Sequence, residues 1–187
     1  MKKINNKGMT VVELILSFAI LTILVLGLLK LVLDVKESMY VEEIYKDLNE
    51  YSNNLNYVLR NDFIVKRVKD VGFRFSGEEE CPVIDNALGF CYKFIFEDLS
   101  SKVLVFNFET HSISYDHKVY PIPHSEEIQT AQYMRRIYPE GGCAAYGDDD
   151  YVSKEGGVIK VKFLMFYRND VDCKNGYGLD IVHPIAQ

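Results

Sequence analysis

The chain starts with one long apolar run. From Leu14 to Leu33, only Ser17, Thr22, Gly27 and Lys30 interrupt the apolar residues. At about 1.5 Å per residue, a helix of this length spans the roughly 30 Å hydrocarbon core of a membrane. The run is apolar around its whole circumference, which is not typical of a helix that packs against a soluble core. The pattern therefore predicts a membrane-spanning helix.

Beyond Val35 the apolar residues narrow to one stripe with helical spacing. Neighbouring stripe positions are separated mostly by three or four residues, and no proline or glycine occurs between Leu28 and Val71. The stripe consists of Val41, Ile44, Leu48, Tyr51, Leu55, Val58, Leu59 and Phe63. We expect one continuous helix, with residues 9–34 in the membrane and residues 35–71 amphipathic and packed on the chain's own sheet. An extracellular coiled coil is the alternative, but the heptad spacing fails after Tyr51.

After Gly72 the spacing changes to that of strands. The expected strands are 90–96, 102–108, 112–120, 158–168 and 177–182. The first two flank the turn residues 97–101, which is typical of a hairpin, while 125–138 fits either a helical turn or an irregular crossing. Residues 72–187 are thus expected to form a globular, extracytoplasmic β-sheet domain. The fold class is α+β, with a long N-terminal helix on a four- to five-stranded, mostly antiparallel sheet.

Charge predicts the orientation of the chain in a membrane. The net charge is −6, yet Lys2, Lys3 and Lys7 precede the apolar run, and Asp34 and Glu37 follow it. Flanking lysines favour the cytoplasmic side, so we expect a single-pass protein with its N-terminus in the cytoplasm. A cleavable secretory signal has a shorter apolar core and a small-residue cleavage site, which is missing here. The acidic remainder argues against direct nucleic-acid binding.

Glu13 is an anomaly at the start of the apolar helix. Burying a charge in a membrane costs on the order of 3 kcal/mol unless the charge finds a partner. One interpretation is that Glu13 is solvated at the interface, near Lys7. Another follows from a cut after Gly8, which would create a free amine at Met9, one helical turn from Glu13. Two axially staggered chains would then pair Glu13 of one chain with the Met9 amine of the next, and this pair would set the register of an assembly.

The segment from Lys2 to about Leu33 resembles the N-terminal motif of the type IV pilin and pseudopilin superfamily. The motif comprises a basic leader (1–8), Gly8 before the cut, Met9, then Thr10-Val11-Val12 and Glu13 ahead of the apolar helix. The resemblance implies that a prepilin peptidase cleaves after Gly8 and N-methylates Met9. It also implies that Glu13 guides docking into a growing filament.

Three departures from the pattern favour a minor subunit. Met9 stands at the first mature position, where phenylalanine is commoner. Lys30 stands where many major pilins carry a proline, and the mature chain is longer than that of many major pilins. The expected function is a structural subunit, a minor pilin, of a type IV pilus or pilus-like filament. The alternatives are a pseudopilin of a type II secretion or DNA-uptake (competence) system and, from another class, a membrane-tethered adhesin or sensor outside any filament.

Partners and location follow from the same resemblance. The expected partners are other pilin or pseudopilin subunits, the prepilin peptidase, and the cytoplasmic membrane with its assembly platform protein. The chain would first reside in the cytoplasmic membrane and then in an extracytoplasmic filament at the cell surface.

The four cysteines fall on the expected outer side, where disulfides form. They are Cys81, Cys91, Cys143 and Cys173. No CxxC motif occurs, and the spacing does not suit zinc. Of three possible connectivities, we favour Cys81–Cys91, which closes a short loop, and Cys143–Cys173, which pins a glycine-rich segment to the C-terminal region. A bridge near the C-terminus also fits the resemblance to pilins, and the alternative is four reduced, buried thiols.

Asp148, Asp149 and Asp150 form an acidic run after the glycine-rich segment. Oxygen ligands of this kind suit calcium, and some pseudopilins hold calcium in a comparable loop, but the alternating spacing of an EF-hand is missing. We expect a solvated acidic loop and no metal or other cofactor. The four histidines are scattered, without an HExxH or GxSxG motif, so we do not expect an enzyme.

Overall fold

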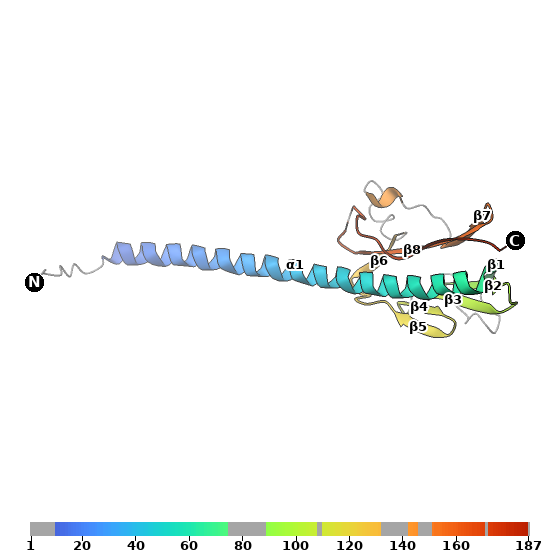
Figure 1. The fold of residues 1–187 in the computed structure, drawn as a ribbon. Helices are drawn as coiled ribbons and strands as arrows, with labels where there is room; N and C mark the ends of the chain where they lie inside the picture. Colours follow the sequence, from blue (N-terminus) through green and yellow to red (C-terminus); the bar gives the residue numbers. More distant parts are fainter. Residues whose placement is uncertain are drawn as a thin grey trace, which may run out of the picture. The chain divides into compact units, whose positions relative to one another are not determined.

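The computed structural model describes residues 10–74, 89–107, 110–131, 142–145, 151–170 and 172–186. The chain divides into two compact units, an N-terminal unit (Met1–Glu43) and a C-terminal unit (Ile44–Gln187). Helix α1 (Val11–Lys66) contributes turns to both units, and it is the long blue-to-green ribbon of Figure 1.

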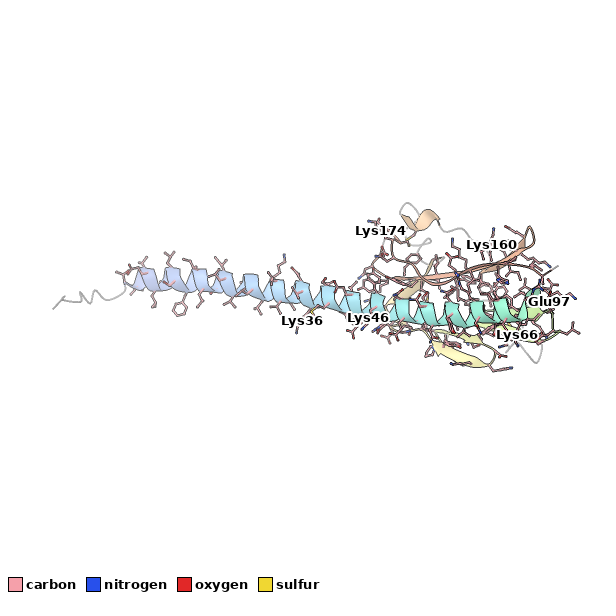
Figure 2. All side chains as sticks on the ribbon, in the orientation of Figure 1. Lys36, Lys46, Lys66, Glu97, Lys160 and Lys174 are labelled. Atoms are coloured by element: carbon pink, nitrogen blue, oxygen red, sulfur yellow. A yellow bond between two sulfur atoms is a disulfide. The ribbon has the colours of Figure 1, made fainter. Side chains whose placement is uncertain are left out.

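In the N-terminal unit, no described residue covers the side chains of α1. Every described residue from Thr10 to Tyr40 is exposed. The helix is long and apolar enough to cross a membrane, and none of its apolar stretch is buried within the protein. Figure 2 shows the side chains of these turns projecting around the helix, with Lys36 near their end. The predicted membrane-length helix is therefore present.

In the C-terminal unit, α1 lies between two sheets (Figure 1). Its buried residues there are Ile44, Leu48, Ser52, Leu55, Leu59 and Phe63. The Phe63 ring lies 4.9 Å from the Phe94 ring of one sheet and 5.7 Å from the His183 ring of the other, measured between centroids. The predicted apolar stripe is thus the face of α1 that enters the core.

Two antiparallel sheets make up the rest of this unit. The first runs in the order β1 (Val68–Arg74), β2 (Gly89–Phe96), β3 (Ser101–Asn107), β4 (Ser112–Tyr115) and β5 (Lys118–Pro121). In the second, β8 (Val158–Tyr167) pairs with β6 (Ile128–Thr130), β7 (Val152–Glu155) and β9 (Tyr177–Pro184). A short 3-10 helix, η1 (Gly142–Ala145), precedes β7.

The core joins the two sheets through aromatic rings. Phe106 of β3 and Phe163 of β8 lie 4.7 Å apart between ring centroids, and Tyr151 contacts both rings. Both phenylalanines are almost completely buried. The burial of each side chain contributes roughly 1.5–3 kcal/mol to the stability of the fold. These contacts make the two sheets and the enclosed turns of α1 one hydrophobic core.

The α+β class and the helix-on-sheet arrangement are confirmed, and the structure adds a second sheet. The segment 112–120 is a hairpin, because Asp116 and His117 both adopt positive φ and turn the chain between β4 and β5. α1 ends at Lys66, so β1 occupies the last residues of the range 35–71. In the segment 125–138, the described residues contain the short strand β6.

Candidate assembly site

The first turn of α1 is closed by a reciprocal cap between Thr10 and Glu13. The Thr10 backbone N–H donates to Glu13 Oε2 at 2.8 Å, and the Thr10 hydroxyl donates to the same oxygen at 2.9 Å. In return, the Glu13 backbone N–H donates to Thr10 Oγ1 at 3.3 Å. This arrangement is a capping box, in which two otherwise unpaired N–H groups at a helix start are satisfied.

The cap gives Glu13 a partner within its own chain and uses only one of its two carboxylate oxygens. Oε2 takes both bonds from Thr10, while Oε1 accepts no hydrogen bond from a described residue. The partial positive charge at a helix N-terminus also favours a carboxylate at this position. The site can therefore bind a cation through Oε1 without giving up the cap. The spacing Thr-x-x-Glu ahead of an apolar run could have revealed the cap in the sequence.

Several predicted site residues lie outside the described residues. They are Gly8, Met9, Cys81, Asp148, Asp149 and Asp150. Cleavage after Gly8, methylation of Met9 and calcium binding by the three aspartates therefore stay predictions.

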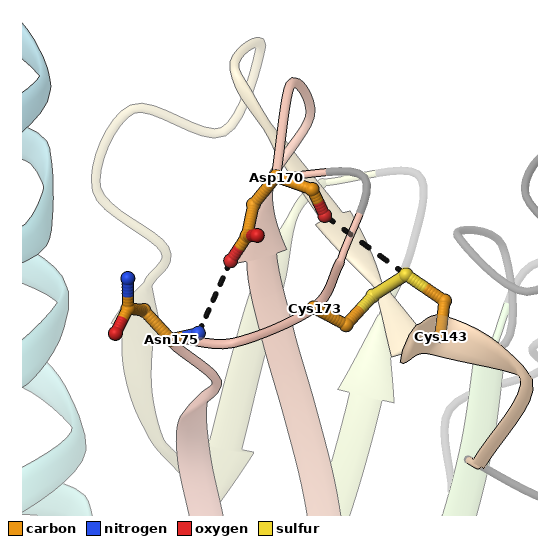
Figure 3. The surroundings of a disulfide bond; sticks show 4 residues. All are labelled: Cys143, Asp170, Cys173 and Asn175. Carbon is orange, nitrogen blue, oxygen red and sulfur yellow. Dashed lines mark hydrogen bonds between the residues drawn. A yellow bond between two sulfur atoms is a disulfide. The ribbon is translucent and has the colours of Figure 1, made fainter. Parts of the chain in front are cut away.

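The predicted disulfide between Cys143 and Cys173 is present, with a Cα–Cα distance of 5.0 Å (Figure 3). It joins η1 to the loop between β8 and β9, and both cysteines are buried. Asp170 braces this loop, because its backbone carbonyl accepts the Cys173 N–H at 3.0 Å and its side chain accepts the Asn175 N–H at 3.1 Å. Cys91 is also disulfide-bonded, and its predicted partner is outside the described residues.

A polar ladder ties α1 to the free edge of β9, and the sequence did not reveal it. Ser52 and Asn56 donate to the Gly178 carbonyl at 2.5 and 2.7 Å, and Ser52 Oγ accepts the Gly178 N–H at 3.0 Å. Two residues further along β9, the Asp180 N–H donates to Asn56 Oδ1 at 3.3 Å, and Arg60 donates to the Asp180 carbonyl at 2.9 Å. Unpaired strand edges invite association with other chains, so this ladder closes one such edge.

An ion triad ties α1 to the first sheet. Lys102 Nζ lies 2.8 Å from Asp62 Oδ2 on α1 and 2.9 Å from Asp116 Oδ2 in the β4–β5 turn. Burial opposes the charge on Lys102, but its hydrogen bonds to both aspartates outweigh this and raise its pKa. Beneath it, burial raises the pKa of Tyr115, whose hydroxyl has no hydrogen-bond partner within the part of the chain that the structure describes.

Within the described ranges, no group of three His, Cys, Asp or Glu side chains could hold a metal ion. Comparisons with protein-family models, with curated proteins and with solved structures find no match for the chain.

Proposed function

We propose that this chain is a structural subunit of a type IV pilus-like filament, a minor pilin, held in the membrane by the first half of α1 and assembled through it. The observation that supports this is the exposed, mostly apolar first half of α1, which is capped at its start by Glu13 and precedes a folded α+β unit. Each large apolar side chain left in water forgoes roughly 1.5–3 kcal/mol of burial free energy. Lipid, or the helices of neighbouring subunits, must therefore cover this surface.

The cap also suggests which partners Glu13 has in the membrane and in the filament. In the membrane, Thr10 satisfies one oxygen of Glu13 and the helix dipole favours its charge. In the filament, the amine of a neighbouring chain, created by cleavage after Gly8, would bind Oε1. Burial of the carboxylate is then offset only in the assembled state, so Glu13 selects one register.

The test separates the charge of Glu13 from its cap. Glutamine at this position of a capping box still accepts the two Thr10 bonds, so Glu13→Gln removes only the charge. Thr10→Ala is the matched control, because it removes the two hydrogen bonds of the Thr10 hydroxyl from the cap and keeps the charge. We expect Glu13→Gln to be depleted from sheared filaments while its amount in the membrane is unchanged, and Thr10→Ala to be incorporated.

Incorporation of Glu13→Gln at the level of the unaltered chain would exclude the charge-pair mechanism. A chain that is never found in a sheared fraction would instead favour a membrane-tethered adhesin or sensor. A pilus and a secretion or competence pseudopilus are separated by which assembly system must be deleted before the chain is lost from the sheared fraction.

A further inference from the structure

We propose that Lys30 and Asp34 form a second charge pair between neighbouring copies, in which Asp34 of one chain binds Lys30 of the next. The inference rests on the proposed function and names a further contact in the same interface. It would make register recognition depend on two charge pairs, one at each end of the apolar half of α1.

Lys30 is an unbalanced cation in the apolar run. It is the only charged residue between Glu13 and Asp34. Both Lys30 and Asp34 are exposed, and neither forms an ion pair with a described residue. Although they are four residues apart on one helix face, a base N-terminal to an acid is the less favourable order within a helix. The chain thus carries two opposite charges whose partners lie elsewhere.

The spacing of these residues matches the stagger that Glu13 requires. Pairing Glu13 of one chain with the amine at position 9 of the next shifts parallel helices by four residues, or about 6 Å. Asp34 and Lys30 also differ by four positions, with the acid again C-terminal to the base. The same shift therefore brings Asp34 of the first chain level with Lys30 of the second, and both pairs have the same polarity.

The two pairs also lie on a common seam. Glu13 and Asp34 are 21 positions apart, which is three heptads. Helices that supercoil to the left keep residues at heptad spacing on one contact line. In straight helices the line drifts by about 20° per heptad, or roughly 60° here, which the long side chain of Lys30 can bridge.

Before assembly, Lys30 would have a different partner. In a membrane, the long side chain of Lys30 reaches the phosphate of a lipid headgroup. A helix that leaves the lipid for a bundle loses that phosphate, and an unpaired buried charge is strongly unfavourable. Asp34 of the neighbouring chain replaces the phosphate only if the copies adopt the four-residue stagger.

The experiment is a charge exchange in the full-length chain, expressed in cells that assemble its filament. Lys30→Glu and Asp34→Lys are made singly and together, and the chain in sheared filaments is measured relative to the chain in the membrane. Because like charges placed opposite each other cost several kcal/mol, we expect each single exchange to lower incorporation at least about tenfold. The double exchange recreates the pair with reversed polarity, so we expect it to restore incorporation to within about threefold of the original level.

Lys36→Glu is the matched control. The same stagger requires an acid at position 40 to partner Lys36, and Tyr40 stands there. We therefore expect Lys36→Glu to change incorporation less than about twofold.

Two results would overturn the pair. Single exchanges that assemble normally would show that these charges are not in contact. Single exchanges that fail without rescue by the double exchange would assign Lys30 to another partner, such as the lipid phosphate. In either case, depletion of Glu13→Gln from the same filaments would leave the Glu13 pair and the proposed function standing. Normal incorporation of every variant would exclude both charge pairs, and absence of the unaltered chain from filaments would exclude the proposed function.

Discussion

Replacing Asn56 by alanine tests the polar ladder that attaches α1 to β9. Asn56 donates to the Gly178 carbonyl at 2.7 Å and accepts the Asp180 N–H at 3.3 Å. The substitution removes both bonds to β9, together with the bonds that the Asn56 amide donates to Ser52 within α1, and leaves the apolar core untouched. Asn54 provides the matched control, because it is exposed on the same helix and its side chain has no hydrogen bond with a described residue.

The magnitude follows from the two lost bonds to β9. Each contributes about 0.5–1.5 kcal/mol to stability, or about 1–3 kcal/mol together. Alanine is a better helix former than asparagine by roughly 0.5 kcal/mol, and this gain is common to both variants. We therefore expect Asn56→Ala to have a free energy of unfolding about 1–3 kcal/mol below that of Asn54→Ala.

The assay is urea unfolding of the full-length chain in detergent micelles, followed by near-ultraviolet circular dichroism. The chain has 13 tyrosines and no tryptophan, so the signal comes from tyrosines, most of them in the C-terminal unit. Equal unfolding midpoints and slopes for the two variants would refute the claim that the ladder stabilises the attachment of α1 to β9.

Three further predictions concern the C-terminal unit. Tyr115→Phe removes a buried hydroxyl that has no partner among the described residues and is expected to raise the free energy of unfolding by about 1 kcal/mol. Tyr51→Phe loses a 3.0 Å bond to a backbone carbonyl of β5 and is expected to lower the free energy of unfolding by about the same amount. Urea titrations in which both variants change stability in the same direction would contradict this contrast. Burial lowers the pKa of His183 below its usual value of 6.5, so the unfolded chain takes up the proton first and stability falls as the pH drops below about 6.5; His183→Phe should lessen that fall between pH 7.5 and pH 5, and an unchanged pH profile would speak against it. Replacing Cys143 and Cys173 by alanine opens a loop with a sequence separation of 30 and is expected to cost about 3–4 kcal/mol in thermal or urea unfolding, which an unaltered unfolding curve would disprove.

The helix and the longer strands could be predicted because their signals are local. The stripe of α1 runs without a proline or glycine to Phe63. The strands β2, β3, β8 and β9 are seven to ten residues long and rich in β-branched, aromatic and other apolar residues. Strands of three or four residues, such as β6 and β7, are too short to show a period. The second sheet was therefore missed.

Contacts between distant residues left no trace in the sequence. Ser52 and Gly178 are 126 positions apart, and nothing near Ser52 indicates that its hydroxyl serves a strand edge. Gly178 itself is required there, because its φ of 146° is one that other residues rarely adopt and a Cβ would collide with the Phe163 carbonyl. By contrast, the cap between Thr10 and Glu13 spans three residues and was accessible from spacing alone.

The central claim is that the chain enters a filament through the N-terminus of α1. The most direct measurement is the intact mass of the chain recovered from sheared filaments. We predict a chain that begins at Met9, carries a methylated α-amine and contains an intact Glu13. Recovery of the chain only from the membrane, with residues 1–8 still attached, would contradict this account.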